Sequence, residues 1–155
     1  MKHIYLISFL LFSINIFCQN FEQGVLNRDE KIKLFEELNI LSNVKIDSLK
    51  TVIIHFFDKP KIRPNGSCID HYTSDKVYSK FIKDNQTIKQ FFMSQKDYKY
   101  NKKAVIEDRN NIIRTLIFEK AQSCGNYIII KPDGKFFKVF GEYHQDLISK
   151  VIEKI

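Results

Sequence analysis

The stretch SCGNYIIIKPDGKFFKVFG, residues 123–141, decides the fold because it predicts two strands that return on each other. Residues 127–131 and 135–140 are rich in the β-branched and aromatic side chains that strands favour. Between them, Pro132 presets φ, Asp133 hydrogen-bonds its own backbone and Gly134 accepts a positive φ. We therefore expect an antiparallel hairpin here, and a sheet to which the remaining elements attach.

Upstream of the hairpin, residues 51–57 (TVIIHFF) are apolar on both faces apart from His55, which is typical of a central strand. Before this strand, apolar side chains at helical spacing predict a helix over residues 28–41, with Asn27 and Glu30 placed as a capping pair. After the strand, two prolines and an Asn-Gly pair predict a loop over residues 58–67.

Cys68 follows this loop directly, and two helices are compatible with the residues after it. A helix that begins at Cys68, capped by Ser67 and Asp70, would place the sulfur where backbone dipoles favour a thiolate. A shorter helix capped by Ser74 would leave Cys68 outside the helix. Farther along, the sequence predicts a strand over residues 87–94, a polar connection over 95–103, a helix over 103–120 and a closing helix over 142–154.

Residues 1–18 have the layout of a secretory signal peptide, with one early cation, Lys2, and an apolar run. A membrane-spanning helix needs about 20 apolar residues, and Ser13 and Asn15 interrupt this run early. Cleavage after Cys18, lipidation of Cys18 and a retained anchor that tethers the chain to a membrane all remain open. We expect an exported protein, either periplasmic or extracellular.

The charge pattern argues against a nucleic-acid partner. The 25 Lys and Arg residues and 18 Asp and Glu residues give a net charge of +7, but no run of five like charges occurs. This pattern is typical of a solvated basic surface. We place Asp75, Asp84, Asp97, Glu107 and Asp108 on solvated faces or turns. We also find no phosphate-binding loop, Ser-His-Asp order or paired-carboxylate motif, so we expect no cofactor.

After removal of residues 1–18, two cysteines remain, Cys68 and Cys124. In an oxidising compartment, an even count favours a disulfide over two free thiols. A metal site that uses the same two cysteines is less favoured than a disulfide. Cys68 and His71 have a Cys-x-x-His spacing, but Cys124 and His144 would have to converge on them, so we expect no metal. His55, inside an apolar strand, is expected to be a hydrogen-bonded core or edge residue rather than a ligand.

From residue 49 onward, strands alternate with helices until the hairpin and the closing helix, which predicts a mixed α/β sheet with helices on both faces. This order, with TVIIHFF as central strand and YIIIKPDGKFFKVFG at the end, resembles the thioredoxin-like superfamily, and in particular its exported redoxin branch. The resemblance implies a four-stranded thioredoxin-like domain over residues 49–155. An N-terminal helical extension over residues 19–48 would precede it.

The chain departs from that superfamily at its active-site motifs. Members carry Cys-x-x-Cys at the start of the first helix, whereas SCIDHY has Cys68 alone, and His71 stands where the second cysteine would be. Members also place a cis-proline just before the third strand, whereas SCGNY has no proline and Cys124 lies close to that position. The resemblance therefore implies that Cys68 and Cys124 face each other across the active-site groove.

Two functions follow from this resemblance. In the first, Cys68 is a nucleophilic thiolate that attacks a disulfide or a peroxide, Cys124 is the resolving thiol, and His71 supports the thiolate as an imidazolium. An unidentified protein partner or thiol donor would supply electrons. In the second, a static Cys68–Cys124 disulfide stabilises a binding or scaffolding domain that has no catalytic activity.

Overall fold

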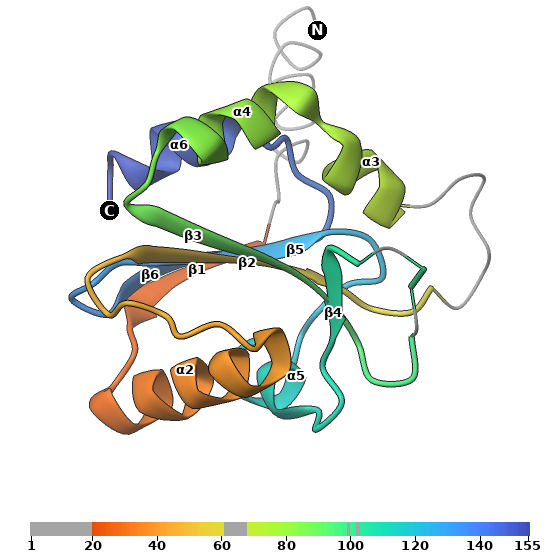
Figure 1. Ribbon diagram of the computed structural model, residues 1–155, viewed down its shortest axis with the longest axis horizontal. Coiled ribbons are helices and arrows are strands. Elements are labelled where there is room, and N and C mark those ends of the chain that lie inside the picture. Colours follow the sequence, from red (N-terminus) through yellow and green to blue (C-terminus); the bar gives the residue numbers. More distant parts are fainter. Residues whose placement is uncertain (1–19, 61–67, 99, 102) are drawn as a thin grey trace, which may run out of the picture.

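The computed structural model describes residues 20–60, 68–98, 100–101 and 103–155. A mixed β-sheet lies between two layers of helices (Figure 1). One face is covered by α3 (Cys68–Ser74), α4 (Lys76–Asp84) and α6 (Asp146–Ile152), and the other by α2 (Arg28–Ser42) and α5 (Ile112–Ile117). The expected mixed α/β architecture with flanking helices is thus confirmed. The proposed signal peptide lies outside the described residues.

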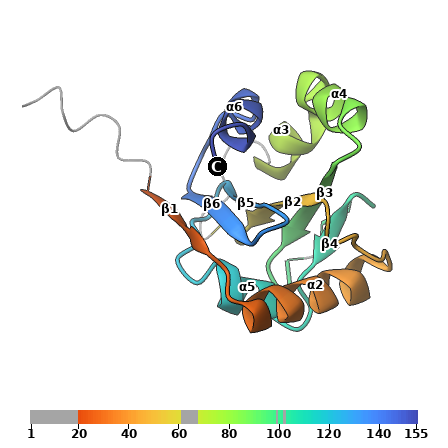
Figure 2. The ribbon, with the colours of Figure 1, turned by 90° about the vertical axis from the view of Figure 1, so that its left-hand side faces the viewer.

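The sheet has six strands in the order β1-β6-β5-β2-β3-β4. Their bounds are β1 (Asn20–Val25), β2 (Thr51–Phe57), β3 (Ile88–Ser94), β4 (Val105–Glu107), β5 (Asn126–Ile130) and β6 (Lys135–Phe140). Strand β2 pairs in parallel with β3 and antiparallel with β5, so it is central, as its apolar sequence predicts. The sheet has two strands more than expected, and these are its edges, β1 and β4 (Figure 2).

The edge strand β1 was missed because its sequence, NFEQGV, is polar and lacks a strand pattern. It forms by pairing antiparallel with β6, where Phe21 lies opposite Val139 and Gly24 opposite Phe136. The Phe21 ring also stacks on Phe137, with the ring centroids 5.5 Å apart. The strand is therefore specified by its partner rather than by its own residues.

The hairpin forms as predicted from residues 132–134. Strands β5 and β6 pair antiparallel, with Ile130 opposite Phe136. Gly134 has a φ of +89°, a value that glycine adopts without steric cost. The Asp133 side chain accepts a hydrogen bond from the Lys135 N–H at 3.1 Å, which is the local aspartate bond expected of such a turn.

The helix predicted over residues 103–120 is wrong, because this segment contains the strand β4 and the short helix α5. Between them, the carboxylate of Asp108 accepts hydrogen bonds from the N–H groups of Ile112, Ile113 and Arg114. Asp108 thereby fixes the start of α5, and it is 0% exposed. Its expected placement on a solvated surface is also wrong.

After Cys68 the chain forms both helices that the sequence left as alternatives. α3 begins at Cys68, and a second helix, α4, follows after a break at Asp75. The Asp75 side chain accepts hydrogen bonds from the N–H groups of Val77 and Tyr78, so Asp75 caps α4 in place of Ser74. The proposed cap Ser67 lies outside the described residues.

Side chains of β2 alternate between two cores, one on each side of the sheet. Val52, Ile54 and Phe56 pack beneath α2 and α5. Ile53 and Phe57 pack on the other side with Ile69 and Tyr72 of α3 and Ile148 of α6. None of the helices in the described part of the chain is long and apolar enough to cross a membrane.

Candidate functional site

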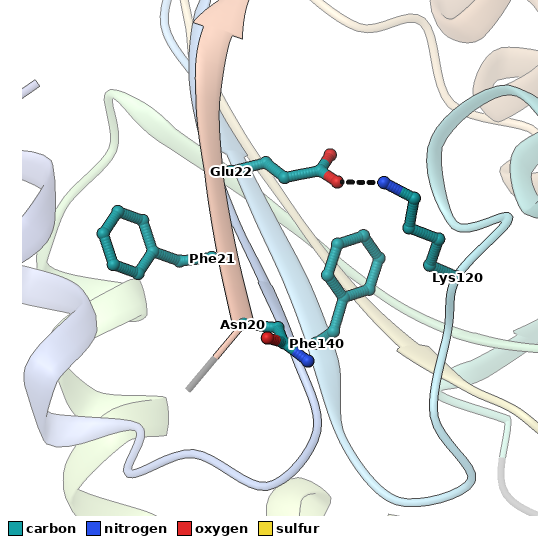
Figure 3. Close-up of a pocket in the computed structure, with 5 residues that line it drawn as sticks. All are labelled: Asn20, Phe21, Glu22, Lys120 and Phe140. Carbon is teal, nitrogen blue, oxygen red and sulfur yellow. Dashed lines mark hydrogen bonds and ion pairs between the residues drawn. The ribbon is translucent and has the colours of Figure 1, made fainter. Parts of the chain in front are cut away.

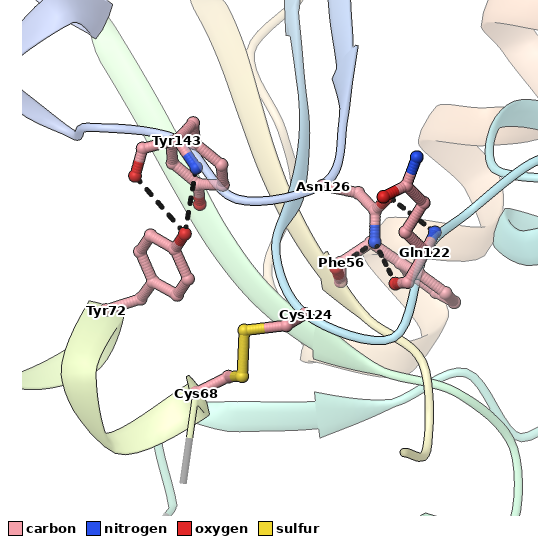
Figure 4. The surroundings of a disulfide bond; sticks show 7 residues. All are labelled: Phe56, Cys68, Tyr72, Gln122, Cys124, Asn126 and Tyr143. Carbon is pink, nitrogen blue, oxygen red and sulfur yellow. Dashed lines mark hydrogen bonds between the residues drawn. A yellow bond between two sulfur atoms is a disulfide. The ribbon is translucent and has the colours of Figure 1, made fainter. Parts of the chain in front are cut away.

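Cys68 and Cys124 form a disulfide, with their Cα atoms 5.8 Å apart although the residues are 56 positions apart in sequence (Figure 4). Cys68 is the first residue of α3, and Cys124 lies in the loop before β5, two residues from Asn126. The pairing implied by the resemblance is therefore present. Both cysteines are half-buried rather than part of either core.

The fold brings these two cysteines to the same end of the sheet. Strand β2 ends at Phe57, and α3 is the next helix or strand of the described chain. Strand β5 is antiparallel to β2, so β5 begins near the point where β2 ends, with Tyr127 opposite His55. A residue just before β5 and a residue at the start of α3 are consequently neighbours, although no local pattern links them.

Tyr72 holds the helix that carries Cys68. It lies one turn after Cys68 on α3, and its hydroxyl donates to the carbonyl of Tyr143 at 3.2 Å and accepts from the Tyr143 N–H at 3.1 Å (Figure 4). The two tyrosine rings also stack, with centroids 4.5 Å apart. Burial raises the pKa of Tyr72, so this hydroxyl stays protonated near neutral pH.

The loop that carries Cys124 contacts the same hydroxyl. Gly125 has a φ of +75°, and a Cβ atom built on it would lie 2.7 Å from the Tyr72 hydroxyl oxygen. Glycine is therefore required at this position both by the backbone conformation and by the approach of Tyr72. Tyr72 thus joins the helix that begins at Cys68 to the loop that carries Cys124, because it follows Cys68 by one turn and lies close to Gly125.

His55 is a buried, hydrogen-bonded core residue, which is one of the two placements that the sequence predicted. It is 0% exposed. Its Nδ1 is hydrogen-bonded to the Tyr143 hydroxyl, and its Nε2 lies 3.0 Å from the Tyr78 hydroxyl. Burial lowers the pKa of His55 to about 3, because the charged ring would lose its hydration, although Gln90 opposes the shift. His55 is therefore neutral at pH 7. Its tyrosine partners were missed, because no sequence signal links them to the histidine.

The remaining histidines of the described structure do not join the cysteines in a metal site. His71 lies on the exposed side of α3, with its ring edge toward Tyr72. His144 is also exposed. Within residues 20–60, 68–98, 100–101 and 103–155, no group of three or more His, Cys, Asp or Glu side chains is placed to hold a metal ion.

An ion pair joins the residue after β2 to α5. The Arg114 Nη2 of α5 donates to Asp58 Oδ2 at 3.1 Å. Burial raises the pKa of Asp58, while the arginine opposes this shift. Arg114 belongs to α5, in the layer of helices on the face opposite α3.

Two open hollows lie along the edge strand β1, and neither is lined by a cysteine. Figure 3 shows the first, a hollow of about 410 Å³ beside Glu22, Lys120 and Phe140. The Lys120 ammonium lies 2.9 Å from a Glu22 carboxylate oxygen across this hollow. The second, of about 590 Å³, lies between β1, β6 and the C-terminal end of α6. The disulfide is thus outside both hollows.

Comparison with known proteins shows the fold. No family model matches this chain, and no curated protein does. Among solved structures, an exposed lipoprotein thioredoxin from Streptococcus pneumoniae, Etrx1, aligns with a TM-score of 0.50 and 14% identity over 70% of this chain and 87% of its own. A secreted Mycobacterium tuberculosis disulfide oxidoreductase homologous to E. coli DsbE aligns with a TM-score of 0.49 and 14% identity over 70% of this chain and 85% of its own. The MTB protein DsbF aligns with a TM-score of 0.47 and 14% identity over 68% of this chain and 81% of its own.

Proposed function

Because this chain has a thioredoxin-like fold with a disulfide at the end of its central strand, we propose that it is an exported thiol-disulfide exchange protein that works through Cys68 and Cys124. One observation carries this proposal. The disulfide joins the helix after β2 to the loop before β5, where the superfamily resemblance locates the active site. Both cysteines are half-buried, so a reacting thiol can reach the bridge.

In the reductive direction, the protein begins as a dithiol. The Cys68 thiolate attacks one sulfur of a substrate disulfide, which forms a mixed disulfide and releases one substrate thiolate. The Cys124 thiolate then attacks Cys68, which reforms the Cys68–Cys124 bond and releases the second substrate thiolate. Two electrons pass from the protein to the substrate, and a thiol donor must return them before the next cycle.

Cys68 is the proposed attacking residue and Cys124 the proposed resolving residue. Cys68 stands on a helix held by Tyr72, and Cys124 follows in a short loop beside it. His71 is exposed on α3, three residues after Cys68. We propose that it supports the Cys68 thiolate as an imidazolium. A peroxide substrate would give the same final disulfide, so its reduction belongs in the same assays.

Single-cysteine variants test this proposal. Cys124→Ser removes the resolving thiol, so Cys68 should accumulate as a mixed disulfide when the variant is incubated with oxidised glutathione or a disulfide-bonded protein. Cys68→Ser should form much less of this adduct. Mass spectrometry counts the adducts. Equal labelling of both variants, or labelling of neither under folded conditions, would contradict the proposed roles.

A second function is favoured by the absence of Cys-x-x-Cys and by the long separation between the two cysteines. A disulfide that closes a loop of 56 positions is well suited to stabilising the fold of an exported binding domain. In this case the bridge would stay oxidised during function. It would also resist glutathione, because structural disulfides usually have potentials below about −300 mV.

Export is part of the proposal and rests on residues 1–18, whose composition predicts a signal peptide. Fractionation of cells that produce the full chain, together with N-terminal sequencing of the product, tests it. We expect a product that begins after the apolar run, outside the cytoplasm. An intact N-terminus on cytoplasmic protein would contradict export.

A further inference from the structure

The side chain of Asn126 ties the loop that carries Cys124 to the sheet with four hydrogen bonds. Its Oδ1 accepts from the N–H of Gln122 at 2.9 Å and from the N–H of Gly141 at 3.3 Å. Its Nδ2 donates to the carbonyl of Phe56 at 3.0 Å and to that of Gln122 at 2.8 Å (Figure 4). Asn126 is 0% exposed, so these bonds are shielded from water.

These four bonds, which we call the Asn126 clamp, connect three strands at one point. Asn126 begins β5, Phe56 belongs to β2, and Gly141 follows the last residue of β6. Both the N–H and the carbonyl of Gln122 bond to the Asn126 side chain, so the two ends of the short loop that contains Cys124 are joined. The loop is therefore fixed by a buried side chain at the point where it enters the sheet.

We propose that Asn126 is a positioning residue that holds Cys124 opposite Cys68 and thereby sets the equilibrium between the dithiol and the disulfide. This inference rests on the proposed redox function, because that function requires Cys124 to close repeatedly on Cys68. None of the four bonds involves a sulfur atom, so opening the disulfide breaks none of them. The clamp is thus able to hold the loop in both redox states.

The physical effect is on the loop in its reduced form. When the clamp is present, the Cys124 thiol stays near Cys68 after reduction, and closing the disulfide orders little additional chain. Without the clamp, the reduced loop gains conformational freedom that must be lost again when the bond forms. The effective concentration of the Cys124 thiol at Cys68 therefore falls, and the disulfide becomes easier to reduce.

Equilibration with reduced and oxidised glutathione tests the clamp. In this exchange the protein disulfide takes two electrons from two glutathione molecules, which become one oxidised glutathione. Asn126→Ala should lower the effective concentration of the thiol pair roughly tenfold, which corresponds to a potential less negative by about 30 mV for a two-electron couple. An unchanged equilibrium constant in the folded variant would overturn the inference.

Asn39→Ala is the matched control, because it also removes asparagine hydrogen bonding. The Asn39 Oδ1 accepts from the N–H of Ile46 at 2.8 Å, on the α2 side of the sheet. This variant should lose stability and keep the glutathione equilibrium of the wild type. For a residue with only a structural role, Asn126→Ala would likewise destabilise the oxidised and reduced proteins equally. By the thermodynamic cycle, the equilibrium would then not move.

Hydrogen exchange on the unmodified protein provides a test that does not depend on folding of the variant. The N–H groups of Gln122 and Gly141 should remain protected after reduction, because the clamp holds them without the disulfide. Loss of this protection on reduction would show that the disulfide holds the clamp, which would overturn the inference. A wild-type potential below about −300 mV would count against the proposed function. The test of the clamp is separate, because it compares the potential of Asn126→Ala with that of the wild type, whatever the wild-type value is.

Discussion

At the scale of single residues, Gly125 lies where the loop that carries Cys124 meets Tyr72 of α3. Its φ is +75°, and a Cβ atom at this position would lie only 2.7 Å from the Tyr72 oxygen, so there is no room for a side chain. Gly125→Ala should therefore lower the free energy of unfolding by about 1 to 3 kcal/mol, measured by urea denaturation of the oxidised protein. Gly24→Ala is the control and should cost less, because only the flexible Phe136 ring must move.

A double-mutant cycle separates the two causes. Tyr72→Phe removes the hydroxyl that the new Cβ would meet, so Gly125→Ala should cost less in this background than in the wild type. The remaining cost would come from the positive φ and from the Gly141 carbonyl oxygen and the Tyr72 ring, which lie 3.1 and 3.2 Å from the new Cβ atom. Additive losses in the two variants would contradict a direct contact between Gly125 and Tyr72.

His55 should make the protein less stable in mild acid. Its pKa falls from 6.5 to about 3 on folding because burial disfavours the charged ring. Between these values the unfolded chain binds a proton that the folded chain does not, so stability is complete above pH 6.5 and is lost as the pH falls. From pH 7 to pH 4, His55 should reduce the free energy of unfolding by about 3 kcal/mol.

The measurement is urea denaturation at several pH values. For each variant, the slope of the free energy of unfolding against pH is compared with that of the wild type, so that the contribution of the carboxylates cancels. His55→Gln should lose the part of the pH dependence described above, whatever its stability at pH 7. His144→Gln, at an exposed position, should retain it. The same slope in His55→Gln as in the wild type would contradict a buried, neutral His55.

The sequence predicted that His55 is a hydrogen-bonded core or edge residue, but it did not predict which residues surround it. A polar residue in an apolar run is informative, because a buried imidazole needs hydrogen-bond partners. Those partners, Tyr78 and Tyr143, lie 23 and 88 positions away. No local period connects such distances, so only the folded sheet could identify them.

At the scale of elements, α5 depends on one buried carboxylate. Asp108 accepts N–H bonds from the first three residues of this six-residue helix. Asp108→Ala should therefore lower the free energy of unfolding by about 2 kcal/mol, since it leaves one buried and two half-buried donors without a partner. Chemical denaturation followed by circular dichroism measures this loss.

Asp84→Ala serves as the control for that variant. Asp84 is exposed at the last turn of α4, and a substitution there should change the free energy of unfolding by less than about 0.5 kcal/mol. Equal effects of the two substitutions would mean that the Asp108 cap contributes little to α5.

The elements with a strong local signal were predicted, and those that depend on neighbours were not. The run TVIIHFF and the Pro-Asp-Gly turn specify β2 and the hairpin directly. In residues 103–120, by contrast, apolar side chains that fit a helical period are divided between β4 and α5. The pairing of Val105 with Phe92 and the Asp108 cap decide this outcome. Pairing with β6 likewise creates β1.

At the scale of the whole molecule, topology produces the site. The two cysteines were identified from the sequence, but their proximity was an implication of the superfamily resemblance. The physical reason is that antiparallel β5 begins beside the end of β2. The Asn126 clamp and the Tyr72 contacts could not be predicted, because each connects segments that are distant in sequence.

The disulfide should also stabilise the molecule as a whole. Closing a loop of this length restricts the unfolded chain by about 4 kcal/mol in the chain-entropy model. The double variant Cys68→Ser/Cys124→Ser should therefore unfold at lower urea concentration than the oxidised protein and near that of the reduced protein. Unchanged stability would mean that the bridge does not constrain the unfolded state.

The reduction potential of the Cys68–Cys124 pair tests the central claim most directly. It is measured by trapping free thiols of the folded protein across a series of glutathione or dithiothreitol buffers. A working exchange protein should have a potential of about −200 mV, within the range of cellular thiol-disulfide couples. A bridge that opens only below about −300 mV would contradict the redox function and identify a structural disulfide in a binding domain.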